Sequence, residues 1–316
     1  MSSSKLTPGQ AENTRAVYRF AVLTASCTVL LLMAGALVTN NDAGDSVPDW
    51  PLAYGRLIPP LVGGIRFEYA HRVVAGIVAI LTLTLAIWLA FAKVRPLAKK
   101  LGWIALILVL AQAGLGALRV EEIHPMFSAT AHATLAQIFF ITIVGLSLYL
   151  SPWWSKDLPR LEDTKSPSLR TLTALTTLAI LAQLILGAAF RHGAFGIQPH
   201  LWGAGVVTFI VVWTGATAKR RFRENRDLRR ATIFLHAFFG IQILLGFAAW
   251  YAVRVIAPES PQPTVLFVTL TVAHVLGSAL TLAASVLLML KAYRLIPGPA
   301  VEMRAAHSTQ SAGAAR

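Results

Sequence analysis

Four histidines, each near one end of a long apolar stretch, are the residues of this sequence best suited to chemistry: His71, His132, His200 and His274. Hydrocarbon offers an imidazole no hydrogen-bond partner, so a histidine inside a membrane span is a candidate functional residue. A single one is more often a hydrogen bond between two helices. Four in a repeated pattern favour iron ligation, because imidazole is a standard axial ligand of heme iron. Two histidines alone make an incomplete zinc site.

One carboxylate distinguishes the first histidine from the other three. Glu68 precedes His71 by three residues, so on a helix the two side chains share a face. At the matching place before His200 stands Ile197. An electron-carrying heme needs only ligands and burial, whereas a proton-coupled oxidation benefits from a carboxylate that accepts protons or stabilises positive charge. We therefore expect Glu68 to be catalytic. The alternative is that Glu68 only forms an ion pair with Arg72 or another arginine.

The elements that must position these side chains are membrane-spanning helices. Of the 316 residues, 13% are charged and 56% are hydrophobic, against about 25% charged in an ordinary soluble domain. A bilayer-spanning helix needs about 20 mostly apolar residues. Eight stretches free of Asp, Glu, Lys and Arg are long enough: residues 20–41, 73–92, 101–118, 123–155, 171–190, 192–218, 231–253 and 260–290. The sequence predicts an all-α, polytopic membrane protein with eight transmembrane helices and no sizeable soluble domain.

The distribution of charge gives the orientation of these spans. The net charge is +14, yet 22 of the 28 Lys and Arg residues fall on the side of the membrane that carries both termini. This asymmetry follows the positive-inside rule, so we expect both termini to be cytoplasmic. The basic run at residues 219–230 is then a topology signal and not a nucleic-acid site. No cleavable signal precedes the first span, which we expect to act as an uncleaved insertion signal.

An internal repeat divides the chain into two halves. The pattern Gln-x-x-x-Gly occurs in the third, fifth and seventh spans, beginning at Gln112, Gln183 and Gln242, and every even span carries one of the four histidines. We predict two pseudo-symmetric four-helix bundles, at residues 18–150 and 171–292, each holding a heme between its two histidines. A cytoplasmic segment (1–17), a cytoplasmic linker (151–170) and a disordered tail (293–316) complete the chain. The small residues of the repeat are explained by close helix approach alone.

The other candidate residues carry weaker signals. Four arginines on the external side either pair with heme propionates or anchor helix ends: Arg72, Arg119, Arg191 and Arg254. The remaining histidines are expected to be interfacial (His124, His192), structural (His236) or part of the tail (His307). Cys27 is the single cysteine, which excludes an internal disulfide and a thiolate-bound metal cluster.

Three segments of the first half resemble the heme A synthase family: Gly35–Gly44 (GALVTNNDAG), Pro48–Pro59 (PDWPLAYGRLIP) and Phe67–Arg72 (FEYAHR). The repeat, the spans and the four histidines agree with this resemblance over residues 18–292, with the second half matched more weakly. The family oxidises the C8 methyl group of heme O to the formyl group of heme A. Two successive hydroxylations are thought to give a geminal diol that loses water.

The resemblance implies a role for each site residue. His71 and His132 would bracket the substrate heme, Glu68 would be the essential acid, and His200 and His274 would ligate a heme B cofactor that relays electrons. It also implies a bacterial cytoplasmic membrane location. Membrane lipid, heme O synthase, cytochrome oxidase assembly factors and further copies of the chain are the partners that it suggests. Many bacterial members carry a cysteine pair in the first external loop, whereas residues 40–66 contain none, so a redox disulfide is excluded here.

Three other functions compete with this assignment. The residues Asn41 to Asp49 match the NDxxDxxxD pattern with which intramembrane prenyltransferases bind Mg²⁺ and a diphosphate, but Gly44 and Pro48 would break the required helix. A diheme b-type electron-transfer protein, such as a quinol-linked subunit, explains the four histidines equally well but leaves Glu68 and the long external loop unexplained. A transporter is disfavoured by the lack of a broken-helix pair.

Overall fold

The computed structural model describes residues 8–120, 125–256 and 263–298, and in these residues the chain is all-helical. Eight of its helices are long and apolar enough to cross a membrane, which confirms the predicted fold class. They are α1 (Pro8–Asn40), α2 (Ile65–Phe91), α3 (Pro96–Val120), α4 (Pro125–Leu150), α5 (Leu169–Arg191), α6 (Gln198–Phe222), α7 (Arg226–Tyr251) and α8 (Val265–Leu295). A short π-helix, η1 (Ala252–Ile256), continues α7.

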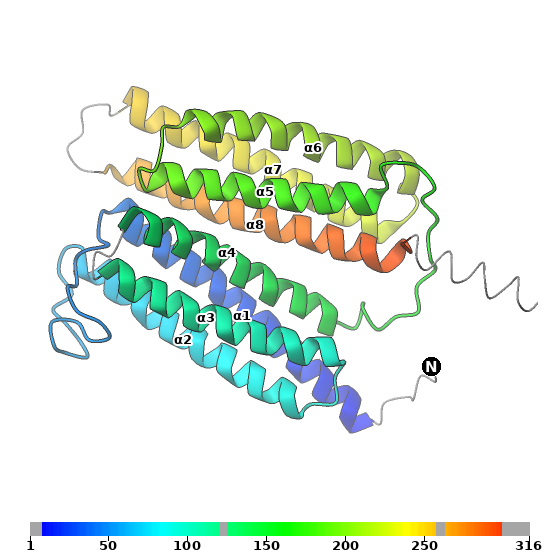
Figure 1. The fold of residues 1–316 in the computed structure, drawn as a ribbon, viewed down its shortest axis with the longest axis horizontal. Helices are drawn as coiled ribbons and strands as arrows, with labels where there is room; N and C mark the ends of the chain where they lie inside the picture. The colour runs from blue at the N-terminus through cyan, green and yellow to red at the C-terminus, as the bar shows by residue number, and fades with distance from the viewer. Residues whose placement is uncertain (1–7, 121–124, 257–262, 299–316) are drawn as a thin grey trace, which may run out of the picture.

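The helices form two groups that lie side by side, α1–α4 and α5–α8 (Figure 1). Each group has its own buried apolar cluster, one built mainly from α1–α4 and the other mainly from α5–α8. A third cluster joins them through α1, α4 and α8, with Leu32, Phe140, Ala279 and Ala283 at its centre. The predicted pseudo-symmetry between the groups remains a prediction.

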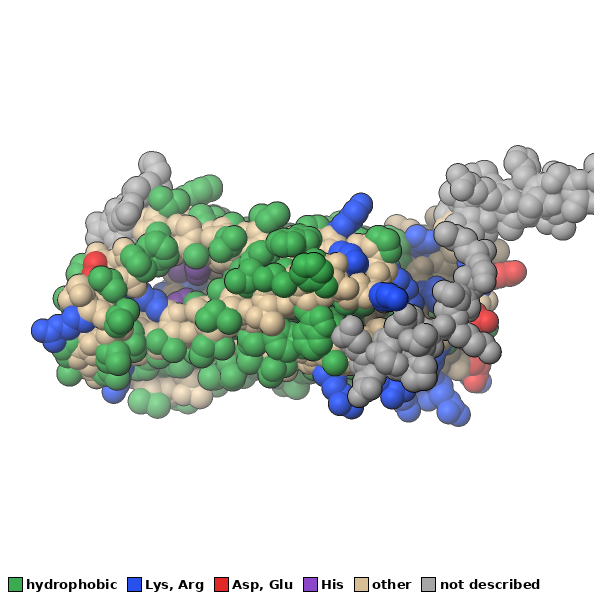
Figure 2. Space-filling model, turned by 90° about the horizontal axis from the view of Figure 1, so that it is seen from below, with side chains coloured by type: hydrophobic (Ala, Val, Ile, Leu, Met, Phe, Trp, Pro, Cys, Tyr) green, Lys and Arg blue, Asp and Glu red, His purple; other side chains and the backbone are tan. Residues whose placement is uncertain are grey.

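Helix α1 begins and α8 ends at the same end of the molecule, beside the α2–α3 and α6–α7 connections (Figure 1). Lys and Arg side chains gather at this end, here called the basic end, and fewer lie at the opposite end (Figure 2). Large apolar side chains such as Leu30, Ile80, Ile107 and Phe209 are exposed between the two ends, as expected of helices that contact lipid. The basic end is the one predicted to be cytoplasmic.

Local sequence explains where several helices begin and end. Ser168, Asn225 and Thr264 cap α5, α7 and α8 by accepting hydrogen bonds from backbone N–H groups three residues later, which satisfies donors that the first helical turn leaves free. Helix α1 begins at Pro8, inside the segment expected to precede the first bundle, and α8 continues to Leu295, past the expected boundary at 292. Residues 299–316, most of the predicted tail, lie outside the described residues.

The tightly packed core lies toward the basic end of both bundles. Fully buried leucines such as Leu85, Leu89, Leu228 and Leu288 belong to the parts of their helices nearest that end. The four candidate histidines lie in the other part of their helices and are only partly buried. Figure 2 shows histidine side chains in a hollow at that end of one face. The fold therefore places the candidate chemistry in the less tightly packed part of each bundle, here called the histidine end.

Candidate functional site

The structure brings the first two candidate histidines together across the first bundle. His71 comes from the beginning of α2 and His132 from the first half of α4. Their ring centroids lie 6.4 Å apart, and the ring planes are inclined by 74°. This pairing was predicted from the sequence, and the geometry agrees with it.

The second two histidines meet in the same way in the second bundle. His200 lies in the first turn of α6 and His274 near the beginning of α8. Their ring centroids are also 6.4 Å apart, with an interplanar angle of 82°. Two sites of equal spacing, one in each bundle, follow from the repeat.

This spacing suits an iron atom held between two imidazoles. An imidazole nitrogen binds a transition metal at about 2 Å, and the ring centre lies about 1 Å behind it, so two axial rings have centroids about 6 Å apart. Within the described residues, no three His, Cys, Asp or Glu side chains come together as they would around a bare metal ion. Two facing imidazoles are the protein ligands of a bis-histidine heme, in which a macrocycle supplies the remaining ligands; that these pairs hold heme remains a prediction.

Each of the four rings lies against a glycine of the preceding helix. A Cβ atom added to that glycine would come within 4 Å of the imidazole Cε1, and at Gly246 it would come within 2.7 Å of His274. The four pairs are Gly35–His71, Gly116–His132, Gly187–His200 and Gly246–His274. These glycines belong to the repeat whose small residues were explained by helix approach alone. The structure adds that they make room for the imidazoles.

Glutamines of the same repeat also contact the histidines, which sequence reasoning did not identify. Gln112 donates a hydrogen bond to the His132 backbone carbonyl at 2.9 Å. Gln183 donates to the His200 carbonyl at 2.8 Å and lies 3.0 Å from its ring Nδ1. The signal that could have revealed them is the constant four-residue spacing between each glutamine and the glycine that faces a ring.

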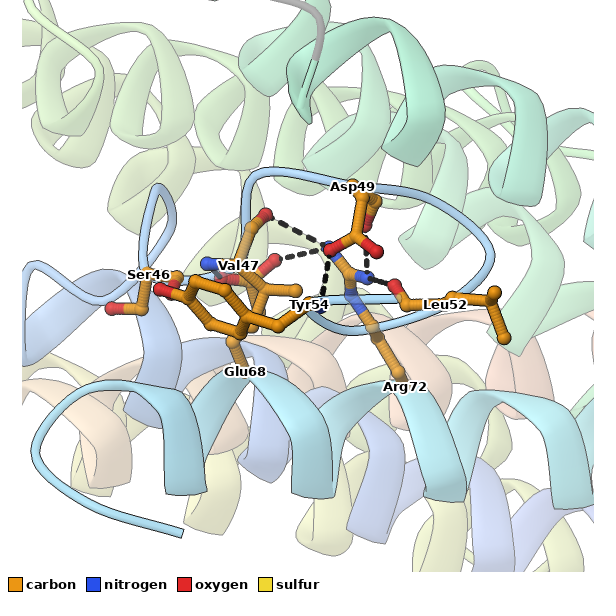
Figure 3. A network of polar contacts seen from close by, with 7 residues as sticks. All are labelled: Ser46, Val47, Asp49, Leu52, Tyr54, Glu68 and Arg72. Atoms are coloured by element: carbon orange, nitrogen blue, oxygen red, sulfur yellow. Dashed lines mark hydrogen bonds and ion pairs between the residues drawn. The ribbon is translucent and has the colours of Figure 1, made fainter. Parts of the chain in front are cut away.

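Glu68 is buried at the beginning of α2 and holds the external loop. Its carboxylate accepts a 2.9 Å hydrogen bond from the Val47 backbone N–H and forms a 2.6 Å ion pair with Arg72 (Figure 3). Arg72 also donates to the backbone carbonyls of Val47, Asp49 and Leu52. The Glu68–Arg72 ion pair is therefore present; whether Glu68 is also catalytic or only forms this pair remains a prediction. The pair ties the loop to the first histidine site.

Turn residues and hydrogen bonds within the loop between α1 and α2 fold that loop. Tyr54 and Gly55 both have positive φ angles, 55° and 66°, as in the turns that suit a tight hairpin. The Asp49 carboxylate accepts hydrogen bonds from the backbone N–H groups of Tyr54 and Gly55. The Gly55 hydrogen bond lowers the pKa of the Asp49 carboxyl below its ordinary value. Because α1 ends at Asn40, the aspartates of the NDxxDxxxD pattern lie in this loop and do not line one helix face.

The other predicted propionate-binding arginines differ in their surroundings. Arg191 donates to the Thr39 carbonyl at 2.6 Å and lies 3.7 Å from the Asp42 carboxylate, so it joins the two bundles at the histidine end. Arg254 is exposed in η1. Arg119 is in the last turn of α3, and its side chain lies outside the described residues. Their contacts with propionates remain predictions.

The remaining histidines do not join either pair in the described part of the chain. His192 caps the end of α5. His236 lies on α7, where its Nδ1 is 2.8 Å from the Thr232 carbonyl and its ring faces Gly215, which agrees with a structural role. His124 and His307 lie outside the described residues.

Comparison with known proteins identifies relatives of this chain. A family model described as "Cytochrome oxidase assembly protein" matches residues 65–203, which contain Glu68, His71, His132 and His200. A protein of Exiguobacterium sibiricum named heme A synthase is 30% identical over 254 residues, which cover 73% of this chain and 82% of that protein. The heme A synthase of Symbiobacterium thermophilum is 28% identical over 258 residues, covering 72% and 83%.

A third relative matches a shorter region. The heme A synthase of Exiguobacterium sp. AT1b is 32% identical over 194 residues, which is 60% of this chain and about half, 52%, of that protein.

Proposed function

This chain belongs to the heme A synthase family, and we propose that it oxidises the C8 methyl group of heme O to the formyl group of heme A. The observation that carries the proposal is the presence of two equally spaced histidine pairs. Among the described residues, a buried carboxylate, that of Glu68, stands one helical turn before a histidine of the first pair only. Converting a methyl group to a formyl group removes four electrons from the substrate. Such a reaction needs one site for the substrate and a route for the electrons.

The first bundle is the proposed substrate site. His71 and His132 would hold the iron of heme O and would thereby keep the macrocycle between α2 and α4. Glu68 would accept protons or stabilise positive charge as the methyl group is oxidised. Its hydrogen bond to Val47 and its ion pair with Arg72 hold the carboxylate in one place, and the loop they anchor covers this part of the bundle.

The second bundle is the proposed electron relay. A heme B between His200 and His274 would supply one-electron transfer when bound. The helix of His132 and the helix of His274 pack against each other through Phe140 and Ala279, so an apolar, densely packed interface separates the two sites. This contact supports a direct path between them.

The proposal also covers the membrane location of the protein and its partners. We propose a bacterial cytoplasmic membrane protein with its basic end and both termini in the cytoplasm, because positive charge accumulates on that side of spanning helices. Heme O synthase would supply the substrate, and cytochrome oxidase assembly factors would receive the product. Arg119, Arg191 and Arg254 are the proposed contacts for propionates, with Arg72 engaged by the loop.

The proposal is tested by product formation in cells. In a host that makes heme O but lacks heme A, expression of this chain should lead to heme A in the extracted pigments, measured by chromatography. The variant Phe209→Leu, which alters an exposed apolar side chain on α6, should give the same yield. Persistence of heme O with no heme A, despite normal amounts of chain in the membrane, would contradict the proposal.

A further inference from the structure

The end of α6 carries a group of basic side chains that the proposed reaction does not use. Lys219, Arg220 and Arg221 lie in the last turn of the helix, and Arg223 follows the helix directly. They lie at the basic end, whereas His200 lies at the other end of α6. The positive-inside rule accounts for the side of the membrane on which these charges stand. It does not require that they surround a hollow, which is what the structure shows.

Two adjoining hollows open beside these side chains, and together they are here called the basic hollow. The larger part has a volume of about 500 Å³ and is lined by Ala216, Lys219, Arg220 and Arg223. The smaller part has a volume of about 290 Å³ and is lined by Lys165, Trp213, Ala216, Thr217, Arg220 and Arg221. Ala216 and Arg220 belong to both parts, so one ligand can contact the end of α6 and the linker between the bundles at the same time.

Three of the five cations around the basic hollow have no anionic partner. Within the described residues, no carboxylate forms an ion pair with Lys165, Lys219 or Arg220. Arg221, in contrast, lies 3.0 Å from the buried carboxylate of Asp163, which holds the linker against α6. The hollow therefore offers uncompensated positive charge to a ligand.

The arginines of the basic hollow favour phosphate as the anion. Arg223 pairs with its neighbour Glu224 at 2.7 Å, but the two side chains are 77% and 87% exposed, and such an exposed pair contributes little to stability. Arg220 has no ion pair in the described part of the chain. A guanidinium presents N–H groups side by side, in a geometry that matches two oxygens of one phosphate.

The basic hollow continues into the apolar surface of α6. Trp213 lines the hollow two helical turns before Arg220 and is 40% exposed, and its neighbour Val212 is 56% exposed. Tryptophan is enriched at the level where lipid headgroups meet hydrocarbon. A soluble anion would contact the cations and leave Trp213 and Val212 without a partner. A ligand that satisfies both parts of the surface has an anionic head and an apolar tail.

We propose that the basic hollow binds the phosphate of an anionic phospholipid from the cytoplasmic leaflet, with an acyl chain lying along Val212 and Trp213. Basic pockets beside membrane helices on the cytoplasmic side are suited to such headgroups. The bound headgroup joins Lys165 of the linker to the end of α6. This inference is independent of the proposed reaction, because both histidine pairs lie at the opposite end of the bundles.

Quenching of Trp213 fluorescence by brominated lipid tests the proposal, because bromine on an acyl chain quenches an indole that the chain contacts. Full-length protein is reconstituted in matched vesicles of phosphatidylcholine and phosphatidylglycerol, in which one or the other lipid is brominated. Each measurement is repeated with Trp213→Phe added, and the difference is the signal of Trp213. We expect phosphatidylglycerol to be preferred at Trp213 by about tenfold or more, since each Lys or Arg near an anionic headgroup contributes about fivefold. Equal quenching by the two lipids would overturn the proposal.

Two double variants with the same change of charge separate the hollow from the general surface. Lys219→Gln with Arg220→Gln removes two cations of the hollow, and the preference should fall by about tenfold or more. Lys93→Gln with Lys100→Gln removes two exposed cations beside the α2–α3 connection. This control should keep the preference within about twofold, because salt screens charges that lie outside the site. An equal loss in both double variants would show that only total charge matters and would refute a specific site.

Ala216→Leu covers the case in which loss of the two cations prevents membrane insertion. The larger side chain fills the hollow and leaves every charge in place, so the preference should fall by about fivefold, as for the loss of one cation contact. A wild-type preference in this variant, at a normal amount of chain in the membrane, would contradict binding in the hollow.

Inorganic phosphate distinguishes a lipid from a soluble anion. Added phosphate is compared with chloride at equal ionic strength, and the preference at Trp213 should be the same in both. Displacement of brominated phosphatidylglycerol by phosphate alone would identify a soluble-anion site and overturn the lipid assignment.

Discussion

Glu68→Gln is expected to lower heme A formation by about a hundredfold or more, the range that a general acid or base contributes, while heme O still binds. The amide oxygen of glutamine can still accept the hydrogen bond from the Val47 N–H, so the loop keeps one of its anchors. What the variant loses is the negative charge and the ability to take up a proton. The measurement is the ratio of heme A to heme O extracted from membranes, together with the amount of heme O retained by the purified variant.

Arg72→Gln is the control that separates chemistry from loop anchoring. It removes the hydrogen bonds to the carbonyls of Val47, Asp49 and Leu52 as well as the ion pair with Glu68. If Glu68 served only to hold the loop, Arg72→Gln would be at least as damaging as Glu68→Gln. We expect it to lower product formation by about tenfold, less than the loss of a general acid or base. A normal yield of heme A from Glu68→Gln would show that the carboxylate is not catalytic.

His200→Ala and His274→Ala are each expected to remove the low-spin absorption signal of heme B. A low-spin heme with two imidazole ligands loses its low-spin state when one ligand is removed. His200 lies on α6 and His274 on α8, and the centroids of their rings are 6.4 Å apart. Heme O should still bind in the first bundle, because His71 and His132 belong to other helices. The measurement is the reduced-minus-oxidised spectrum of each purified variant, with heme content determined separately.

A control variant and a contradicting outcome make this prediction testable. His236→Ala alters a histidine of the same bundle that bonds its own helix, and it should leave the heme B signal in place. Retention of the signal in both His200→Ala and His274→Ala would show that the ligands were assigned to the wrong residues.

Most of the helices could be predicted from the stretches of sequence that lack charged residues. The stretch 171–190 lies within α5, which runs from Leu169 to Arg191. The predicted spans agree less well with the helices whose first turns contain charged residues. Helix α2 begins at Ile65, eight residues before the uncharged stretch 73–92, because Arg66, Glu68 and Arg72 are part of the helix. A charge-free run marks the part of a helix that lies in hydrocarbon, whereas the helix itself continues to the interface.

The histidine pairs could also be predicted, but the contacts around them could not. The repeat places one histidine on every even helix, and helix packing then brings two together in each bundle. Whether Glu68 meets Arg72, Val47 or a ring depends on how the loop after α1 folds back over α2, which no local periodicity encodes. The approach of Gln183 to His200 depends in turn on the space left by Gly203 on the next helix. Such contacts are tertiary, and they become evident only when the helices are assembled.

The most direct test of the central claim is the pigment content of the purified protein, with and without co-expressed heme O synthase. Pyridine hemochrome spectra and chromatography of the extracted hemes give the type and number of hemes per chain. The two histidine pairs, with Glu68 close to the first in the described part of the chain, predict heme B in one site and heme O or heme A in the other when heme O is supplied. Heme B alone at two per chain, unchanged by heme O synthase, would contradict the account and identify a diheme electron carrier.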